Sequence, residues 1–233
     1  MPKALINFGA VLNAALFLAA CNSANTTPRP EGASASAASK TQAGTNDPRI
    51  AAADKGRIAG DSAAKTWVII ASDFQCPFCK QWHTESYKQF IDEYVRTGKV
   101  KVAYINYPLG QHQNAVPSAQ AAMCASAQNK FWQYHDALFD TQDKWEKMPD
   151  PRPVLDSIAR QVGVNFDEWS KCVDADTMLP LIFADRDRAS TAGVQSTPSF
   201  LIGGQVIAGA VPLSELEAVV DSAIAKSGSK PPQ

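Results

Sequence analysis

The chain has 233 residues, of which 45% are hydrophobic, so it can bury one sizeable core. Its 22 basic and 23 acidic residues give a formal net charge of −1. No basic patch or stripe stands out along the sequence, which argues against a nucleic-acid partner.

The N-terminal segment has the layout of a secretory signal. A short positive start is followed by the mostly apolar stretch ALINFGAVLNAALFLAA, in which Asn7 and Asn13 interrupt a run too short for a transmembrane helix. The sequence LAAC that ends at Cys21 resembles the lipobox of bacterial lipoproteins. This resemblance implies that residues 1–20 are a cleaved lipoprotein signal peptide and that Cys21 carries the lipid anchor. The alternative is an ordinary cleaved signal with an incidental cysteine.

Residues 22–48 are rich in Ser, Ala, Thr, Gly and Pro and lack apolar periodicity. Such composition is typical of a flexible linker. We expect residues 21–55 to form a disordered tether that holds the folded part away from a membrane.

A strand–helix–strand unit follows within residues 56–109. Residues 66–74 (TWVIIASDF) and 100–109 (VKVAYINYPL) predict strands. Between them, apolar and aromatic residues recur on one face of a helix that Gly98 ends. The spacing is that of a βαβ unit with a parallel strand pair. The helical face comprises His83, Tyr87, Phe90, Ile91 and Tyr94.

The pattern becomes helical over residues 110–192 and reverts to strands afterwards. Residues 193–229 predict two short strands across Gly203-Gly204 and a C-terminal amphipathic helix. A βαβ half and a ββα half therefore enclose a helical block. The helices expected in the block span residues 115–128, 131–139, 153–161, 166–173 and 178–192.

Cysteine spacing points to redox chemistry. Without Cys21 four cysteines remain, an even number of the kind expected where disulfides persist. Of the three possible connectivities, the economical one pairs Cys76 with Cys79 and Cys124 with Cys172. Cys76 should begin a helix with Pro77 in its first turn, where N–H groups and the helix dipole lower a thiol pKa. Cys79, one turn further on, should be more buried, which suggests an attacking Cys76 and a resolving Cys79.

The motifs FQCPFC and GVQSTPSFLIGG together resemble the DsbA-like branch of the thioredoxin superfamily. The resemblance covers residues 67–227 and implies an α/β thioredoxin fold, a central mixed sheet flanked by helices, with an inserted all-helical subdomain. It also implies a cis peptide bond at Pro198 opposite Cys76, with the backbone of Thr197 available to an extended substrate. The spacing alone leaves a trans-proline at the start of an edge strand equally open.

The resemblance further implies that Cys124 and Cys172 form a structural disulfide within the insertion, with a second redox pair as the alternative. The aromatic residues of the insertion are expected to form its core rather than a substrate platform. Apolar residues around the motif are better candidates for substrate contact. The insertion aromatics are Phe131, Trp132, Tyr134 and Trp145; the contact candidates are Phe74, Pro77, Phe78 and Trp82.

Two departures from the family leave the direction of electron flow open. Ile70 occupies the position where many thioredoxin-like proteins carry a buried carboxylate, and Asp73 is a poor substitute three residues before Cys76. The dipeptide between the cysteines is Pro77-Phe78, without the histidine of the strongly oxidising enzymes.

These observations predict an exported thiol–disulfide oxidoreductase, lipid-anchored to a bacterial membrane on its periplasmic or extracellular face. We expect a monomeric oxidase that needs no cofactor or metal, acts on unfolded or cysteine-containing exported proteins, and is recycled by a membrane redox partner. One alternative is a reductase or isomerase. Another is a non-cycling lipoprotein that binds peptides or a metal, the latter through Cys76, Cys79 and His83 with His112 or His135.

Overall fold

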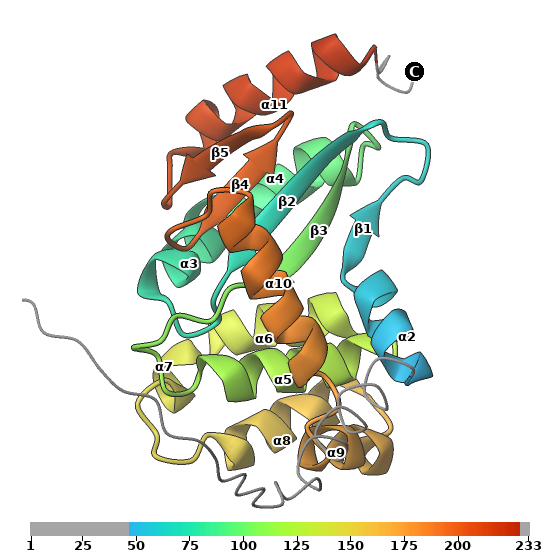
Figure 1. The fold of residues 1–233 in the computed structure, drawn as a ribbon, viewed down its shortest axis with the longest axis vertical. Helices are drawn as coiled ribbons and strands as arrows, with labels where there is room; N and C mark the ends of the chain where they lie inside the picture. Colours follow the sequence, from blue (N-terminus) through green and yellow to red (C-terminus); the bar gives the residue numbers. More distant parts are fainter. Residues whose placement is uncertain (1–46, 229–233) are drawn as a thin grey trace, which may run out of the picture.

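A computed structural model describes residues 47–228 (Figure 1). The expected signal peptide, Cys21 and most of the expected tether lie outside the described residues. Within residues 47–228, no helix combines the length and the apolar character that a bilayer-spanning segment needs.

A five-stranded mixed sheet with the strand order β1-β3-β2-β4-β5 forms the centre of the fold. The central strand β2 runs parallel to β3, with Thr66 opposite Val100, and antiparallel to β4. This confirms the expected parallel pair and the mixed α/β class. The strands are β1 (Ile58–Gly60), β2 (Thr66–Ser72), β3 (Val100–Asn106), β4 (Ser199–Ile202) and β5 (Gln205–Ala208).

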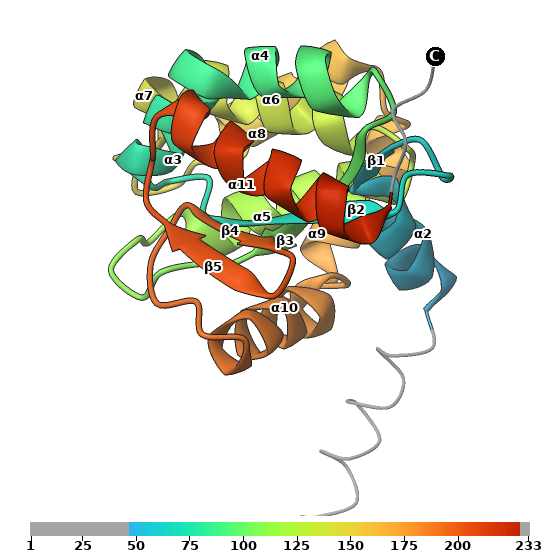
Figure 2. The same cartoon turned by 90° about the horizontal axis from the view of Figure 1, so that it is seen from above.

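Helices cover both faces of the sheet (Figure 2). Side chains alternate across a strand, so Val68 and Ile70 of β2 pack with α11 (Leu213–Ser227) and the long helix after β2, while Ala71 packs with α10 (Leu179–Thr191) on the other face. β2 is therefore buried on both faces.

The long helix that starts at the redox pair contains π-helical turns. Its expected inward face is buried at Tyr87, Phe90 and Tyr94, whereas Ile91 is only partly buried. Each π-helical turn holds more residues than an α-helical turn, so the buried face shifts around the helix axis. The consecutive segments are α3 (Pro77–Trp82), η1 (His83–Tyr87), α4 (Lys88–Phe90) and η2 (Ile91–Val95), with η1 and η2 π-helical.

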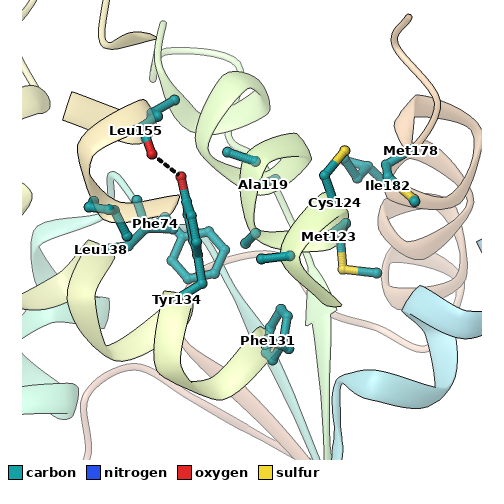
Figure 3. Packing of buried hydrophobic residues seen from close by; sticks show 14 of the residues in the cluster. Phe74, Ala119, Met123, Cys124, Phe131, Tyr134, Leu138, Leu155, Met178 and Ile182 are labelled. Atoms are coloured by element: carbon teal, nitrogen blue, oxygen red, sulfur yellow. Dashed lines mark hydrogen bonds between the residues drawn. The ribbon is translucent and has the colours of Figure 1, made fainter. Parts of the chain in front are cut away.

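The insertion is helical, as expected, and its helices form a core that also includes Phe74 and Tyr104 (Figure 3). Phe131, Tyr134 and Trp145 are fully buried and Trp132 is half-buried, so these aromatics serve packing. The Tyr134 hydroxyl donates to the Leu155 carbonyl over 2.8 Å, which satisfies the one polar atom of that side chain. The remaining helices are α5 (Ala115–Ser126), α6 (Phe131–Asp140), α7 (Gln142–Trp145), α8 (Arg152–Val162) and α9 (Phe166–Asp174).

A disulfide between Cys124 and Cys172 joins α5 to α9, with Cα atoms 5.8 Å apart and 48 residues of separation. This is the pairing that the sequence favoured. In the chain-entropy model a loop of that length contributes roughly 4 kcal/mol of stability. Both of its cysteines are buried, and they belong to the same apolar cluster as Cys76 and Cys79.

The last part of the expected tether is a helix instead, α2 (Pro48–Gly56). Asp47 caps it by accepting from the Arg49 N–H, and Pro48 occupies its first turn. Ala53 is fully buried, and a Cβ on Gly56 would lie 2.4 Å from the Ser126 carbonyl oxygen, so α2 packs tightly against the end of α5. This helix was not predictable from the sequence, because tertiary contacts rather than an amphipathic pattern stabilise it.

A buried ion pair ties the start of the folded part to α10. Arg57, which follows α2, contacts the fully buried carboxylate of Asp185. The same carboxylate accepts from the backbone and side-chain N–H groups of Asn106 over 3.1 and 2.9 Å. Three distant segments therefore meet at one charge that is fully partnered, the condition under which a buried carboxylate is tolerated.

Candidate active site

The cysteine pair lies where β2 gives way to the long helix. The chain leaves β2 at Ser72, and Cys76 is the N-cap residue of α3, with extended φ and ψ of −70° and 125°. Pro77 sits in the first turn, where its missing N–H breaks no helical bond. Cys76 and Cys79 are both free thiols in this structure. The expected position at a helix N-terminus is thus observed.

Both cysteines are buried, and Cys79 is the more buried of the two, as expected. Cys76 is 3% exposed and Cys79 is 1% exposed. The segment before β4 covers Cys76, since the Cys76 Sγ lies 3.4 Å from the Thr197 carbonyl oxygen. The Thr197–Pro198 peptide bond is cis, as the resemblance implied.

The apolar surface beside the pair is smaller than expected. Pro77 is exposed and Phe78 is 60% exposed, so both can contact a bound chain. The prediction that Phe74 and Trp82 contact the substrate is wrong, because their side chains are buried, with 1% and 3% exposure. Phe74 stacks on Tyr104 with ring centroids 5.0 Å apart, inside the core beneath the site.

The environment of Cys76 favours its thiolate. The thiol of Cys79, acting as a hydrogen-bond donor, is the main cause that lowers the Cys76 pKa to about 6, and it outweighs burial. The Thr197 side chain and the backbone N–H groups of Phe78 and Cys79 lower the Cys76 pKa further. The Thr197 hydroxyl has no fixed partner within residues 47–228, so it is free to turn toward the sulfur. With this pKa, about nine tenths of Cys76 is ionised at pH 7.

The second thiol behaves in the opposite way. Burial raises the pKa of Cys79 well above its ordinary value, and the neighbouring Cys76 adds to the shift. The pair therefore carries one negative charge, on the sulfur nearer the surface. Burial likewise raises the pKa of Tyr104, whose hydroxyl has no hydrogen-bond partner in the described part of the chain.

Asp73 organises the turn before the helix rather than reaching either sulfur with its carboxylate. Its oxygens accept from the backbone N–H groups of Gln75 and Leu109 over 2.8 and 2.9 Å, and one lies 2.7 Å from His112 Nδ1. Burial raises the pKa of Asp73, and these partners oppose the shift. All of its hydrogen bonds hold the turn, so nothing in this geometry makes it a proton relay.

Sequence reasoning missed the insertion residue that holds the active-site backbone. Gln142, in the short helix α7, donates from Nε2 to the carbonyl oxygens of Phe74 and Cys76 over 2.7 and 3.1 Å. Nearby, Gln75 Oε1 accepts from the Asn114 N–H over 2.6 Å. The insertion thus fixes the loop that carries Cys76. Gln142 stands in a polar stretch, TQDKW, that gives no signal of burial.

The metal-ligand set considered from the sequence is not assembled. Within residues 47–228, the potential ligands that come together with His83 are His135 and Asp136. Neither cysteine belongs to that group. His112 pairs with Asp73 instead. The cysteines are therefore free for thiol chemistry.

Comparison with known proteins places this site in a family. The thioredoxin family model matches residues 52–222. A protein-disulfide oxidoreductase of Rickettsia bellii is 26% identical over 174 residues, which are 74% of this chain and 66% of that protein. A disulfide bond formation protein D of Bacillus cereus is 26% identical over 63% of this chain and 69% of its own length.

A solved structure shows the same fold. The crystal structure of Wolbachia pipientis alpha-DsbA1 superposes with a TM-score of 0.66 and 21% sequence identity, covering 73% of this chain and 92% of that one. At that identity the similarity speaks to the fold, which agrees with a thioredoxin sheet that carries a helical insertion. The chain spans about two thirds of the curated relatives given above. The chain belongs to the thioredoxin family as a DsbA-like thiol–disulfide oxidoreductase, the class that its cysteine and proline motifs indicated.

Proposed function

We propose that the chain is an oxidase that donates the Cys76–Cys79 disulfide to exported proteins. The observation that carries this proposal is the stabilised Cys76 thiolate, with its pKa lowered to about 6. A thiolate stabilised in the dithiol form makes the disulfide easier to reduce and therefore a stronger oxidant. A low-pKa thiol is also the better leaving group when a mixed disulfide is resolved.

The lowered Cys76 pKa makes a modest contribution to the reduction potential of the pair. Relative to a thiol with the ordinary value of 9.0, the Cys76 pKa of about 6 stabilises the dithiol form at pH 7 by about 1.4 kcal/mol. That corresponds to about 30 mV, against a span of about 150 mV between thioredoxin and DsbA. The shift therefore acts in the direction of an oxidase and supplies part of the difference.

The cycle that we propose begins with the disulfide form. A substrate thiolate attacks Cys76 Sγ, the Cys76–Cys79 bond breaks, and Cys79 leaves as a thiolate that takes up a proton. The second substrate thiol, once deprotonated, attacks the substrate sulfur of the mixed disulfide and releases Cys76 as its stabilised thiolate. The substrate is oxidised by two electrons and the pair becomes a dithiol, which a membrane redox partner reoxidises.

The location and partners belong to the same proposal. Residues 1–20 serve as a lipoprotein signal, Cys21 carries the lipid, and the folded part works as a monomer outside the cytoplasm. Its substrates are unfolded or cysteine-containing exported proteins. The exposed side chains of Pro77 and Phe78 offer them an apolar surface beside Cys76.

The reduction potential of the Cys76–Cys79 pair, measured by equilibration in glutathione buffers, tests the direction. A reduction potential above about −200 mV supports the oxidase. A reduction potential near the value of about −270 mV found for thioredoxin makes the chain a reductase. Trapping separates either enzyme from a binding protein. A Cys79→Ala chain should accumulate mixed disulfides through Cys76, whereas a non-cycling binding protein should accumulate none.

A further inference from the structure

A groove of about 1010 Å³ lies away from the cysteine pair, along the long helix and α6. Neither Cys76 nor Cys79 lines it. Charged and ring-nitrogen side chains line much of its wall, among them His83, Asp92, Arg96, Asp136 and Asp140.

Three potential metal ligands converge at one end of this groove. His83 comes from η1, and His135 and Asp136 come from α6. One ligand atom from each lies within 4.8 Å of the others. The other ring nitrogen of His83, Nε2, lies 3.4 Å from Asp140 Oδ1, a contact that helps to orient the ring.

The two rings are held in place by their neighbours. His83 stacks between Tyr87 and Phe139, each with its ring centroid 5.0 Å away. His135 is 2% exposed and packs edge-on against Phe74 and Phe139. Such packing fixes the direction in which ring nitrogens point, as in sites whose ligands are pre-positioned.

One nitrogen in this cluster lacks a partner. His83 Nδ1 is buried and makes no hydrogen bond to any group in residues 47–228. The His83 side chain is only 10% exposed, so water gives little compensation. Buried polar atoms are nearly always partnered, and an orphan of this kind points to a group that is bound in the working protein.

We propose that His83, through its unpartnered Nδ1, together with His135 and Asp136 binds a zinc ion or a similar divalent transition metal, with a water molecule as the fourth ligand. Two imidazoles favour transition metals over calcium and magnesium, which prefer oxygen ligands. Tetrahedral zinc takes ligands at about 2.0–2.2 Å. The Asp136 side chain is 48% exposed and has room to rotate inward and close the site.

The ion would join two parts of the fold. His83 lies on the helix that starts at Cys76, and its backbone N–H donates to the Cys79 carbonyl oxygen. His135 and Asp136 belong to the insertion. A bound ion therefore clamps the long helix to the insertion, and it should raise the thermal unfolding temperature because it binds only the folded chain.

The test is a calorimetric titration of the purified full chain with zinc chloride. The chain is used in its disulfide form, with any free thiol blocked by iodoacetamide, so that cysteine sulfur cannot bind the metal. We expect one zinc ion per chain and an increase in unfolding temperature, with no binding of calcium or magnesium. Asp136→Asn and His83→Gln should each weaken zinc binding at least tenfold and abolish the thermal shift.

Asp92→Asn is the matched control. Asp92 lines the same groove but is paired with Lys88 and Arg96, so its variant removes the same charge without removing a ligand. Zinc affinity should stay within about twofold in this variant. Absence of zinc binding to the parent chain, or binding that Asp136→Asn and Asp92→Asn weaken equally, overturns the proposal. Circular dichroism of each variant verifies its fold, and the half-exposed Asp136 tolerates asparagine.

Discussion

The low pKa of Cys76 depends mainly on one neighbour, so replacing that neighbour should move it. In the Cys79→Ala chain the leading hydrogen bond to the Cys76 sulfur is lost, while Thr197 and the helix N–H groups stay. The Cys76 pKa should rise from about 6 toward its ordinary value of 9.0. If the rise were complete, the ionised fraction at pH 7 would fall from about nine tenths to about one in a hundred.

Ultraviolet absorbance of the thiolate, followed from pH 4 to pH 10, measures this fraction directly. Alkylation rates are a weaker measure, because a thiolate of higher pKa is intrinsically more nucleophilic and offsets part of the change. Cys79→Ser is the matched control, since a hydroxyl retains a donor at nearly the same place. We expect the Cys76 pKa in Cys79→Ser to lie between that of the parent and that of Cys79→Ala.

A Cys79→Ala chain that still titrates near pH 6 would refute this reasoning. The helix N-terminus and Thr197 would then stabilise the thiolate by themselves. The unfolding temperature of each variant, measured at the same pH, shows whether the long helix has stayed in place.

Further predictions concern stability and pH. Replacing both Cys124 and Cys172 by Ala should lower the free energy of unfolding in urea by roughly 4 kcal/mol. The Cys76 pKa should stay unchanged, because neither residue is among the groups that shift it, and a changed pKa would show that the disulfide holds the Cys76 loop in place. Asp185→Asn removes the buried counter-charge of Arg57, which keeps only the half-exposed Asp54, and should lower that free energy by roughly 3 kcal/mol, so a loss below about 1 kcal/mol in urea would exclude a structural ion pair. The Cys76 pKa is about 6 in the folded dithiol form, against an ordinary value of 9.0 in the unfolded chain. The thiolate therefore contributes its full stabilisation of the folded dithiol form above pH 9, and this stabilisation is lost as the pH falls through 6. Between pH 6 and pH 9 the dithiol form should gain about 3 kcal/mol on the disulfide form, and parallel stability curves for the two forms would count against the shift.

Periodic segments were predictable from the sequence. The expected helices of the insertion differ from the observed ones by at most two residues at either end. α6, α8 and α9 each carry an apolar face that needs a partner, whereas α5 is recognisable by its run of small apolar residues and is buried on nearly all sides. The position of Cys76 at a helix N-terminus was also predictable, because Pro77 directly after it is favoured in the first turn of a helix and disfavoured further inside one.

Features that depend on tertiary contacts between distant parts of the sequence were not predictable. The helix α2 is held by the close approach of Gly56 to Ser126, which no local pattern encodes. Gln142 supports the active-site loop from 66 residues away in sequence, as measured to Cys76. Phe74 looked like a contact residue because it adjoins the motif, but its side chain points into the core on which the motif rests.

The position of β2 between β3 and β4 has a consequence for how the chain folds. β3 follows β2 closely, but β4 arrives only after the whole insertion, and Asp185 is separated from Arg57 by 128 residues. Closing a loop of that length has to precede the contacts that reward it, which slows folding. A chain that leaves a ribosome or a membrane channel N-terminus first therefore holds an unfinished sheet until residue 208 is free. Its cysteines are all exposed to the surroundings before the framework that sorts them is complete.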